Sequence, residues 1–164
     1  MGTWKGDFAA QLLAVAKPDR LYLIDPWEHR EESAYEAAIF GGGASDGPAE
    51  MEAVYQGVLR RFESEIEGGR VHVSRMRSPD AAAQLEDACL DWAYIDGDHT
   101  YEAVKADLHA YWRLLNTGGL LAGDDYGLAG WWEDGVTRAV DEFADRDRCE
   151  GPTIIGSQFL FTKI

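Results

Sequence analysis

Residues 91–100 read DWAYIDGDHT, and residues 114–126 read LLNTGGLLAGDDY. Each stretch contains a short apolar run that predicts a buried strand, and aspartates follow soon after each run. In open α/β sheets, ligands bind at the carboxyl ends of the strands. These two stretches therefore predict both a fold class and the position of a site within it.

Helical and strand-like segments alternate along the rest of the chain. Apolar residues at helical spacing predict helices over residues 7–17, 49–67, 78–86, 101–115 and 136–146. Short apolar runs predict strands over residues 20–24, 71–74, 91–95 and 120–122. Gly156-Ser157 predicts a hairpin that joins strands 153–155 and 158–163. The alternation predicts an α/β fold with a Rossmann-like, doubly wound and mostly parallel sheet, closed by the antiparallel hairpin, in a single domain over residues 1–164.

Composition narrows the classes of partner. The formal net charge of -15 argues against nucleic acid and against an anionic membrane surface, because both require a basic patch. Cys89 and Cys149 form no CxxC pair, which is typical of reduced thiols in a cytoplasmic protein. No signal peptide and no apolar run of membrane-spanning length are recognisable. We therefore expect a cytoplasmic protein with a small-molecule partner, and homo-oligomerisation is left open.

Carboxylates follow two of the predicted strands. Asp96 comes after the 91–95 strand, and Asp124 and Asp125 come after the 120–122 strand. Carboxylates crowded at one sheet edge repel unless protons or a cation relieve them, and Mg²⁺ prefers oxygen ligands. The alternative is that these acids cap helices or remain solvated. His99 lies three residues after Asp96 and is a candidate general base.

A glycine-containing segment at the start of the chain predicts a ligand contact. Residues 2–6 read GTWKG and lead directly into the first predicted helix. Glycines permit a close approach of the backbone, and a helix N-terminus attracts negative charge. Asp25 follows Gly6 by 19 residues, a spacing suited to a carboxylate that accepts ribose hydroxyls. The full G-x-G-x-x-G pattern is absent, which argues against a dinucleotide.

Five segments together resemble a known family. They read GTWKGDFA, LYLIDPW, YIDGDHTYEAVKADL, LLNTGGLLAGDDY and FLFTKI. In this order they resemble the class I S-adenosylmethionine-dependent methyltransferases, in the small bacterial branch related to macrocin O-methyltransferase and CmcI. The resemblance implies an enzyme, expected to be an O-methyltransferase, that uses S-adenosylmethionine and Mg²⁺.

The resemblance also implies residue roles. The cofactor contacts of the family map onto Gly2, Thr3, Gly6, Asp25, Trp27, Ser78 and Asp96. By this resemblance, Gly2 and Gly6 line the methionine and ribose part of the cofactor, and Asp25 holds the ribose hydroxyls. Trp27 and Ser78 border the adenine. The metal ligands of metal-dependent relatives map onto Asp96, Asp124 and Asp125, and the base of some relatives maps onto His99.

The chain departs from the family at its start. The family has an acidic residue and an apolar strand before the GTWKG segment, whereas this sequence begins at Met1. We therefore expect a chain that is truncated relative to the family, with its first strand missing. In the family that strand lies between the strands that match residues 20–24 and 91–95, so both are expected to lack a ladder partner. There are two alternatives to an active methyltransferase. The first is a non-catalytic or incomplete methyltransferase-like fragment, and the second, less favoured, is a nicotinamide-dependent oxidoreductase.

Overall fold

The computed structural model describes residues 1–43, 45–146 and 149–164. These residues form two compact units, of which one spans Gly2–Arg77 and the other contains Met1 and Ser78–Ile164. The single-domain organisation stays a prediction.

The first unit is built around two parallel strands. Its elements are α1 (Asp7–Val15), β1 (Leu21–Asp25), the short 3₁₀ helix η1 (Ser33–Tyr35), α2 (Pro48–Arg61), α3 (Glu63–Glu67) and β2 (Val71–Arg75). β1 pairs with β2 from Leu21↔Val71 to Asp25↔Arg75. Gly6 has a φ of 77° in the left-handed region that glycine tolerates, and α1 begins directly after it.

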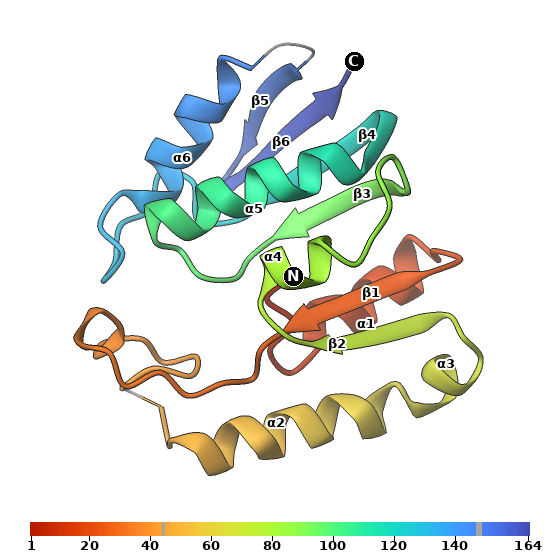
Figure 1. The fold of residues 1–164 in the computed structure, drawn as a ribbon, viewed down its shortest axis with the longest axis vertical. Coiled ribbons are helices and arrows are strands. Elements are labelled where there is room, and N and C mark those ends of the chain that lie inside the picture. Colours follow the sequence, from red (N-terminus) through yellow and green to blue (C-terminus); the bar gives the residue numbers. More distant parts are fainter. Residues whose placement is uncertain (44, 147–148) are drawn as a thin grey trace. The chain divides into compact units, whose positions relative to one another are not determined.

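The second unit is a four-stranded sheet with helices packed against it. Its elements are α4 (Ser78–Ala82), β3 (Leu90–Ile95), α5 (Tyr101–Leu114), β4 (Leu115–Gly123), α6 (Gly135–Ala144), β5 (Cys149–Ile155) and β6 (Gln158–Lys163). The strand order is β3-β4-β6-β5, in which β3 and β4 are parallel and β6 is antiparallel to both neighbours. Helices α5 and α6 lie beside this sheet (Figure 1) and bury apolar faces that include Leu108, Tyr111 and Phe143.

The predicted fold class is confirmed, including the hairpin at Gly156-Ser157. The strand pairs can be followed in the part of the chain that the structure describes. There, β1 pairs only with β2, and β3 pairs only with β4, so the strands fall into two separate sheets.

Several predicted elements differ from the observed ones. Helix α4 ends at Ala82 rather than at residue 86, and β5 begins at Cys149 rather than at Thr153. The helix expected over residues 49–67 is divided at Phe62, whose φ of -110° and ψ of 18° leave the helical region. Phe62 is 2% exposed, and its ring lies so close to Gly6 that an added Cβ there would be 2.6 Å from Cε2. Strand β4 begins earlier than expected because Leu115 already pairs with Leu90, ahead of an irregularity that separates this pair from Trp92↔Leu120.

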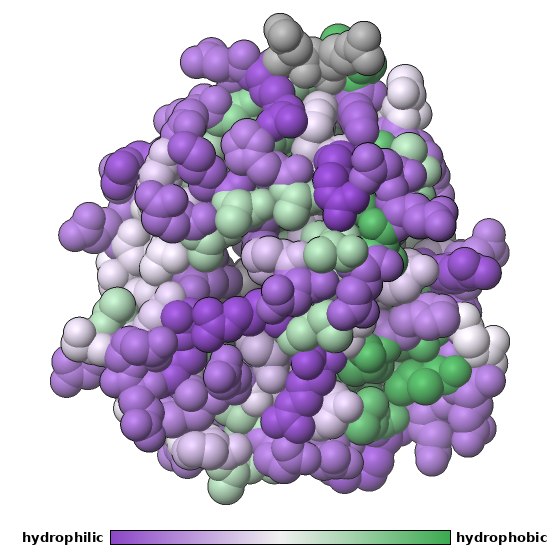
Figure 2. Space-filling view, viewed as in Figure 1, coloured by the Kyte–Doolittle hydropathy of each residue, from purple (hydrophilic) through white to green (hydrophobic). Residues whose placement is uncertain are grey.

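One face of the molecule is mostly polar (Figure 2). On the face shown in Figure 2, hydrophilic residues cover most of the area, in agreement with the net charge of -15. Among the described residues, none of the helices combines the length and the apolar character that a membrane span requires.

Candidate functional site

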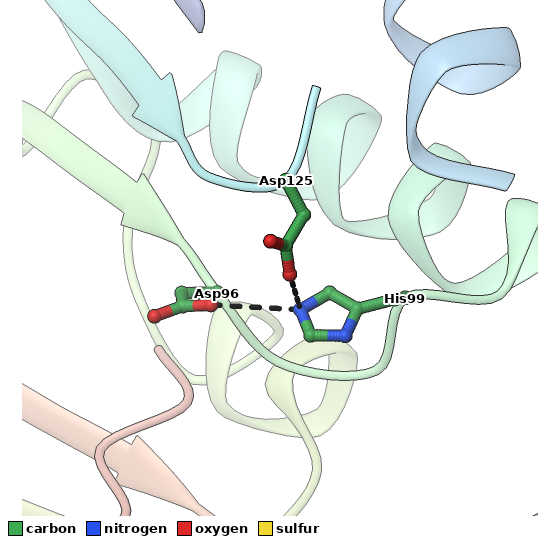
Figure 3. Close-up of side chains that lie close together, drawn as sticks. All are labelled: Asp96, His99 and Asp125. Atoms are coloured by element: carbon green, nitrogen blue, oxygen red, sulfur yellow. Dashed lines mark ion pairs between the residues drawn. The ribbon is translucent and has the colours of Figure 1, made fainter. Parts of the chain in front are cut away.

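Three side chains meet where β3 and β4 end. Asp96 directly follows β3, His99 lies in the connection from β3 to α5, and Asp125 follows β4. The Nε2 atom of His99 is 3.1 Å from Oδ2 of Asp125 and 3.5 Å from Oδ1 of Asp96 (Figure 3). Their side chains are partly exposed, from 15% for His99 to 40% for Asp96. Because both strands are parallel, their carboxyl ends bring these residues to one edge, as the sequence predicts.

The loop that carries His99 is held in place by local contacts. Asp98 accepts a hydrogen bond from the backbone N–H of Thr100 at 3.0 Å, which closes an Asx turn just before α5. Gly135, the first residue of α6, packs so closely that an added Cβ would be 2.7 Å from the carbonyl oxygen of His99. The indole of Trp132 lies against the imidazole, with ring centroids 4.7 Å apart. The position of His99 is therefore defined by its own loop and by the segment over residues 132–135.

Electrostatics favour a charged histidine in this cluster. Burial lowers the pKa of His99, but the contact with Asp96 and the charges of Asp125 and Asp96 outweigh it, so that the pKa is raised. Burial raises the pKa of Asp125, and the nearby Asp124 and Asp96 add to this while His99 opposes it. A cation among these carboxylates therefore relieves repulsion, whether it is a proton on His99 or a metal ion.

The donor atoms suit a divalent metal. One donor atom from each of Asp96, His99 and Asp125 lies within 4.8 Å of the other two. Nε2 of His99 is buried, and although two carboxylate oxygens are within ion-pair distance, neither has the geometry of a hydrogen bond with it. The two carboxylates offer hard oxygen donors that fit Mg²⁺ or Mn²⁺, and Nε2 of His99 lies directly beside them.

Asp124 lies in the same turn but not in this cluster. Its Oδ1 accepts hydrogen bonds from the backbone N–H of Asp125 at 2.9 Å and from the hydroxyl of Ser157 at 2.6 Å. The hydroxyl of Tyr94 is 3.4 Å from Oδ2. Of the three predicted metal ligands, the structure thus brings Asp96 and Asp125 together with His99, whereas the carboxylate of Asp124 is engaged by protein donors.

In the first unit, Asp25 organises the GTWKG segment. Its Oδ2 accepts the backbone N–H of Trp4 at 2.9 Å, and its Oδ1 accepts that of Trp27 at 2.7 Å. The backbone N–H of Gly2 and the hydroxyl of Thr3 both donate to the carbonyl of Ile24, at 2.9 and 3.3 Å. Burial raises the pKa of Asp25, although the hydrogen bonds from Trp4 and Trp27 partly lower it. The predicted cofactor residues around Asp25 are therefore neighbours.

Trp27 and Gly6 have structural contacts in the same unit. The indole of Trp27 is only 2% exposed and donates to the carbonyl of Trp4 at 2.9 Å. Its ring packs on Tyr55, with centroids 5.0 Å apart. Little of the Trp27 side chain is thus available to a ligand, whereas Gly2, with a φ of 73°, and Gly6 keep a left-handed backbone.

Ser78 leads to a residue that the sequence analysis did not single out. The hydroxyl of Ser78 hydrogen-bonds to Asp107, and its carbonyl accepts the hydroxyl of Tyr111 at 2.9 Å. Asp107 is 2% exposed, and burial raises its pKa to about 6 despite the contact with Ser78. The signal was present in the helical spacing, because Asp107 lies three residues after the apolar Val104 and four before Tyr111.

Comparison with known proteins identifies the family. A family model described as a methyltransferase domain matches residues 1–126. The chain belongs to this methyltransferase family. The resemblance inferred from the sequence motifs is thereby confirmed, and the nicotinamide alternative gains no support.

Structural neighbours agree with this methyltransferase fold. The O-methyltransferase NovP matches with a TM-score of 0.62 and 18% identity over 99% of this chain and 69% of its own. The O-methyltransferase TomG from Streptomyces achromogenes, solved in complex with SAM, matches with a TM-score of 0.61 and 16% identity over 99% of this chain and 70% of its own. At these identities the likeness establishes the fold alone.

One curated relative matches part of the methyltransferase chain. An uncharacterised protein of Acanthamoeba polyphaga mimivirus is 35% identical over 65 residues, which cover 37% of this chain and 29% of the relative. The chain also spans 60% of the length of a structural neighbour from Corynebacterium glutamicum. The chain thus spans only part of the length of these relatives.

Proposed function

We propose that the protein transfers the methyl group of S-adenosylmethionine to a hydroxyl oxygen of a small-molecule acceptor, with the help of a divalent metal such as Mg²⁺. The observation that carries the proposal is the meeting of Asp96, His99 and Asp125 at the ends of two parallel strands. Membership of the methyltransferase family supports the reaction class. The names of NovP and TomG as O-methyltransferases support an oxygen acceptor.

The GTWKG segment and Asp25 would bind the cofactor, which supplies an electrophilic methyl group on its sulfonium sulfur. The left-handed backbone at Gly2 and Gly6 allows close approach, and the N-terminus of α1 follows directly. Each carboxylate oxygen of Asp25 accepts one backbone N–H and keeps a further lone pair, which leaves capacity for ribose hydroxyls. Further contacts proposed from the family resemblance are those of Thr3, Trp27, Ser78 and Asp96.

Asp96 and Asp125 would hold the metal, which supplies Lewis acidity that lowers the pKa of the acceptor hydroxyl. His99 then serves as the general base that removes the hydroxyl proton at Nε2. For Asp124, the predicted ligand role competes with the hydrogen bonds that its carboxylate already accepts. The indole of Trp132 restricts His99 on one side and would form a wall for the acceptor.

Titration of S-adenosylhomocysteine into the 164-residue chain tests the cofactor assignment. We expect micromolar binding by calorimetry, and loss of most of this affinity in Asp25→Asn. Absence of binding to the wild-type chain contradicts the cofactor assignment for this chain and favours the alternative of an incomplete fragment. Repeating the titration with Mg²⁺ or Mn²⁺ shows whether metal and cofactor bind together.

A turnover assay tests the role of His99. S-adenosylhomocysteine release is measured with a panel of phenols, sugars and hydroxylated natural-product scaffolds, in the presence of Mg²⁺. We expect His99→Ala to lose about 10²-fold or more in turnover while cofactor affinity changes little. His109→Ala, at an exposed position of α5, is the matched control. Equal turnover in both variants would remove His99 from the mechanism.

The cellular location, the partners and the oligomeric state of the protein are proposed from the sequence alone. A cytoplasmic location, the absence of nucleic-acid and membrane partners, and the oligomeric state stay predictions.

A further inference from the structure

The turn of the carboxyl-terminal hairpin contacts the end of β4 on both sides of Asp125. The hydroxyl of Ser157 donates to Oδ1 of Asp124 at 2.6 Å, and its carbonyl accepts the backbone N–H of Tyr126 at 2.8 Å. Asp124 and Tyr126, the residues on either side of Asp125, are therefore both hydrogen-bonded to Ser157. This contact bridges 33 positions of sequence, so it is independent of the local helix and strand patterns.

Asp125 itself has an unusual backbone conformation. Its φ of 65° lies in the left-handed region, which costs conformational free energy for a residue with a side chain. The N–H of Asp125 donates to the same Oδ1 of Asp124 that Ser157 holds. In this conformation Oδ2 of Asp125 lies 3.1 Å from His99 (Figure 3). The surrounding hydrogen bonds thus offset the cost of a conformation that the cluster requires.

We propose that Ser157, acting through Asp124, is a positioning residue that holds Asp125 in the conformation that directs its carboxylate toward His99. The inference rests on the proposed function, because that function makes Asp125 part of the active site. It also gives Asp124 a role that accounts for its engaged carboxylate. Ser157 lies beyond residues 1–126, where the family model matches, so the match does not describe this contribution.

The first test measures geometry without metal. In the wild-type chain, nuclear Overhauser effects are expected between the ring protons of His99 and the β-protons of Asp125. Ser157→Ala should lose them, whereas Ser157→Thr should keep them because it retains the hydroxyl. Thr153→Ala, at an exposed position of the same hairpin, controls for general effects on β5 and β6. Thermal unfolding of each variant records whether the fold is intact.

The second test measures Mn²⁺ affinity by electron paramagnetic resonance of the unbound ion. Loss of a group that orients a metal ligand typically weakens binding by about tenfold or more, and we expect this of Ser157→Ala but not of Ser157→Thr. Asp124→Asn keeps the oxygen that accepts both hydrogen bonds, so its loss of affinity should be much smaller than that of Asp125→Asn. Equal losses in these two variants would identify Asp124 as a ligand and overturn its positioning role.

The outcomes separate this inference from the proposed function. Wild-type protein that binds no Mn²⁺ contradicts the metal-assisted part of the proposed function, and the Overhauser effects then decide the inference alone. If Ser157→Ala keeps both the His99–Asp125 contact and wild-type Mn²⁺ affinity, Ser157 is not a positioning residue. If Ser157→Ala does not fold, the comparison of Asp124→Asn with Asp125→Asn still decides the inference.

Discussion

Replacement of Asp107 by asparagine will change how the free energy of unfolding depends on pH. Asp107 is 2% exposed, and burial raises its pKa from the ordinary value of 3.8 to about 6, with the charge of Asp98 adding to the rise and the contact with Ser78 opposing it. A carboxyl group with a higher pKa in the folded state binds its proton more tightly there than in the unfolded chain. Stability therefore falls as the pH rises through this range.

The expected magnitude follows from the two pKa values. Their difference corresponds to about 3 kcal/mol, of which about 2 kcal/mol develops between pH 4 and pH 7. Other titrating groups act in both proteins, so the difference in unfolding free energy between wild type and Asp107→Asn isolates this carboxyl. The variant should gain about 2 kcal/mol relative to wild type as the pH rises from 4 to 7.

Urea unfolding followed by tryptophan fluorescence, at intervals of half a pH unit, measures this difference. Glu102→Gln removes the same charge at an exposed position of α5 and serves as the control. A difference between wild type and Asp107→Asn that stays constant from pH 4 to pH 7 would refute the reasoning. It would mean that the carboxyl is better solvated or better paired than its burial and its contact with Ser78 indicate.

Four further substitutions test the geometry of the two units. Gly6→Ala should lower the unfolding free energy by about 2 kcal/mol, because φ is +77° and the added Cβ would lie 2.6 Å from a buried phenylalanine ring. Gly57→Ala, in the interior of α2 with open space around it, should instead stabilise by about 0.5 to 1 kcal/mol in the same urea titration. Gly130→Ala places a Cβ 2.6 Å from the Trp132 ring, so Overhauser effects between that ring and the imidazole beside it should disappear. Asp25→Asn turns an amide group toward a backbone N–H, and calorimetry should show about tenfold weaker S-adenosylhomocysteine binding or worse.

The sequence was sufficient for the fold because local patterns encode it. Alternating helical and strand periodicities predict the element order, and the rule for carboxyl ends of parallel strands places Asp96, His99 and Asp125 at one edge. The break at Phe62 was not predictable from periodicity, because apolar residues continue at helical spacing on either side of it. It depends on a ring packing against Gly6, which is a contact between distant parts of the chain.

The predicted metal ligands also depend on contacts between distant parts of the chain, which the sequence pattern does not reveal. The sequence places Asp124 and Asp125 side by side, and nothing in their order says which carboxylate faces His99. That choice depends on the left-handed φ of Asp125 and on a hydroxyl contributed by Ser157 from the far end of the chain. Only the folded hairpin brings that hydroxyl to the turn.

The four aspartates Asp25, Asp96, Asp124 and Asp125 differ in how many hydrogen bonds their carboxylate oxygens already accept from the protein. Oδ1 of Asp124 accepts two protein hydrogen bonds, which uses both lone pairs of the atom that the turn requires. Asp25 accepts one backbone N–H on each oxygen, from Trp4 and from Trp27, and thereby shapes the loop that contains them. The carboxylate oxygens of Asp96 and Asp125 instead face a buried Nε2 of His99 at ion-pair distance without hydrogen-bond geometry. Because a buried polar group without a satisfied partner is costly, a cation bound between these carboxylates would stabilise the protein.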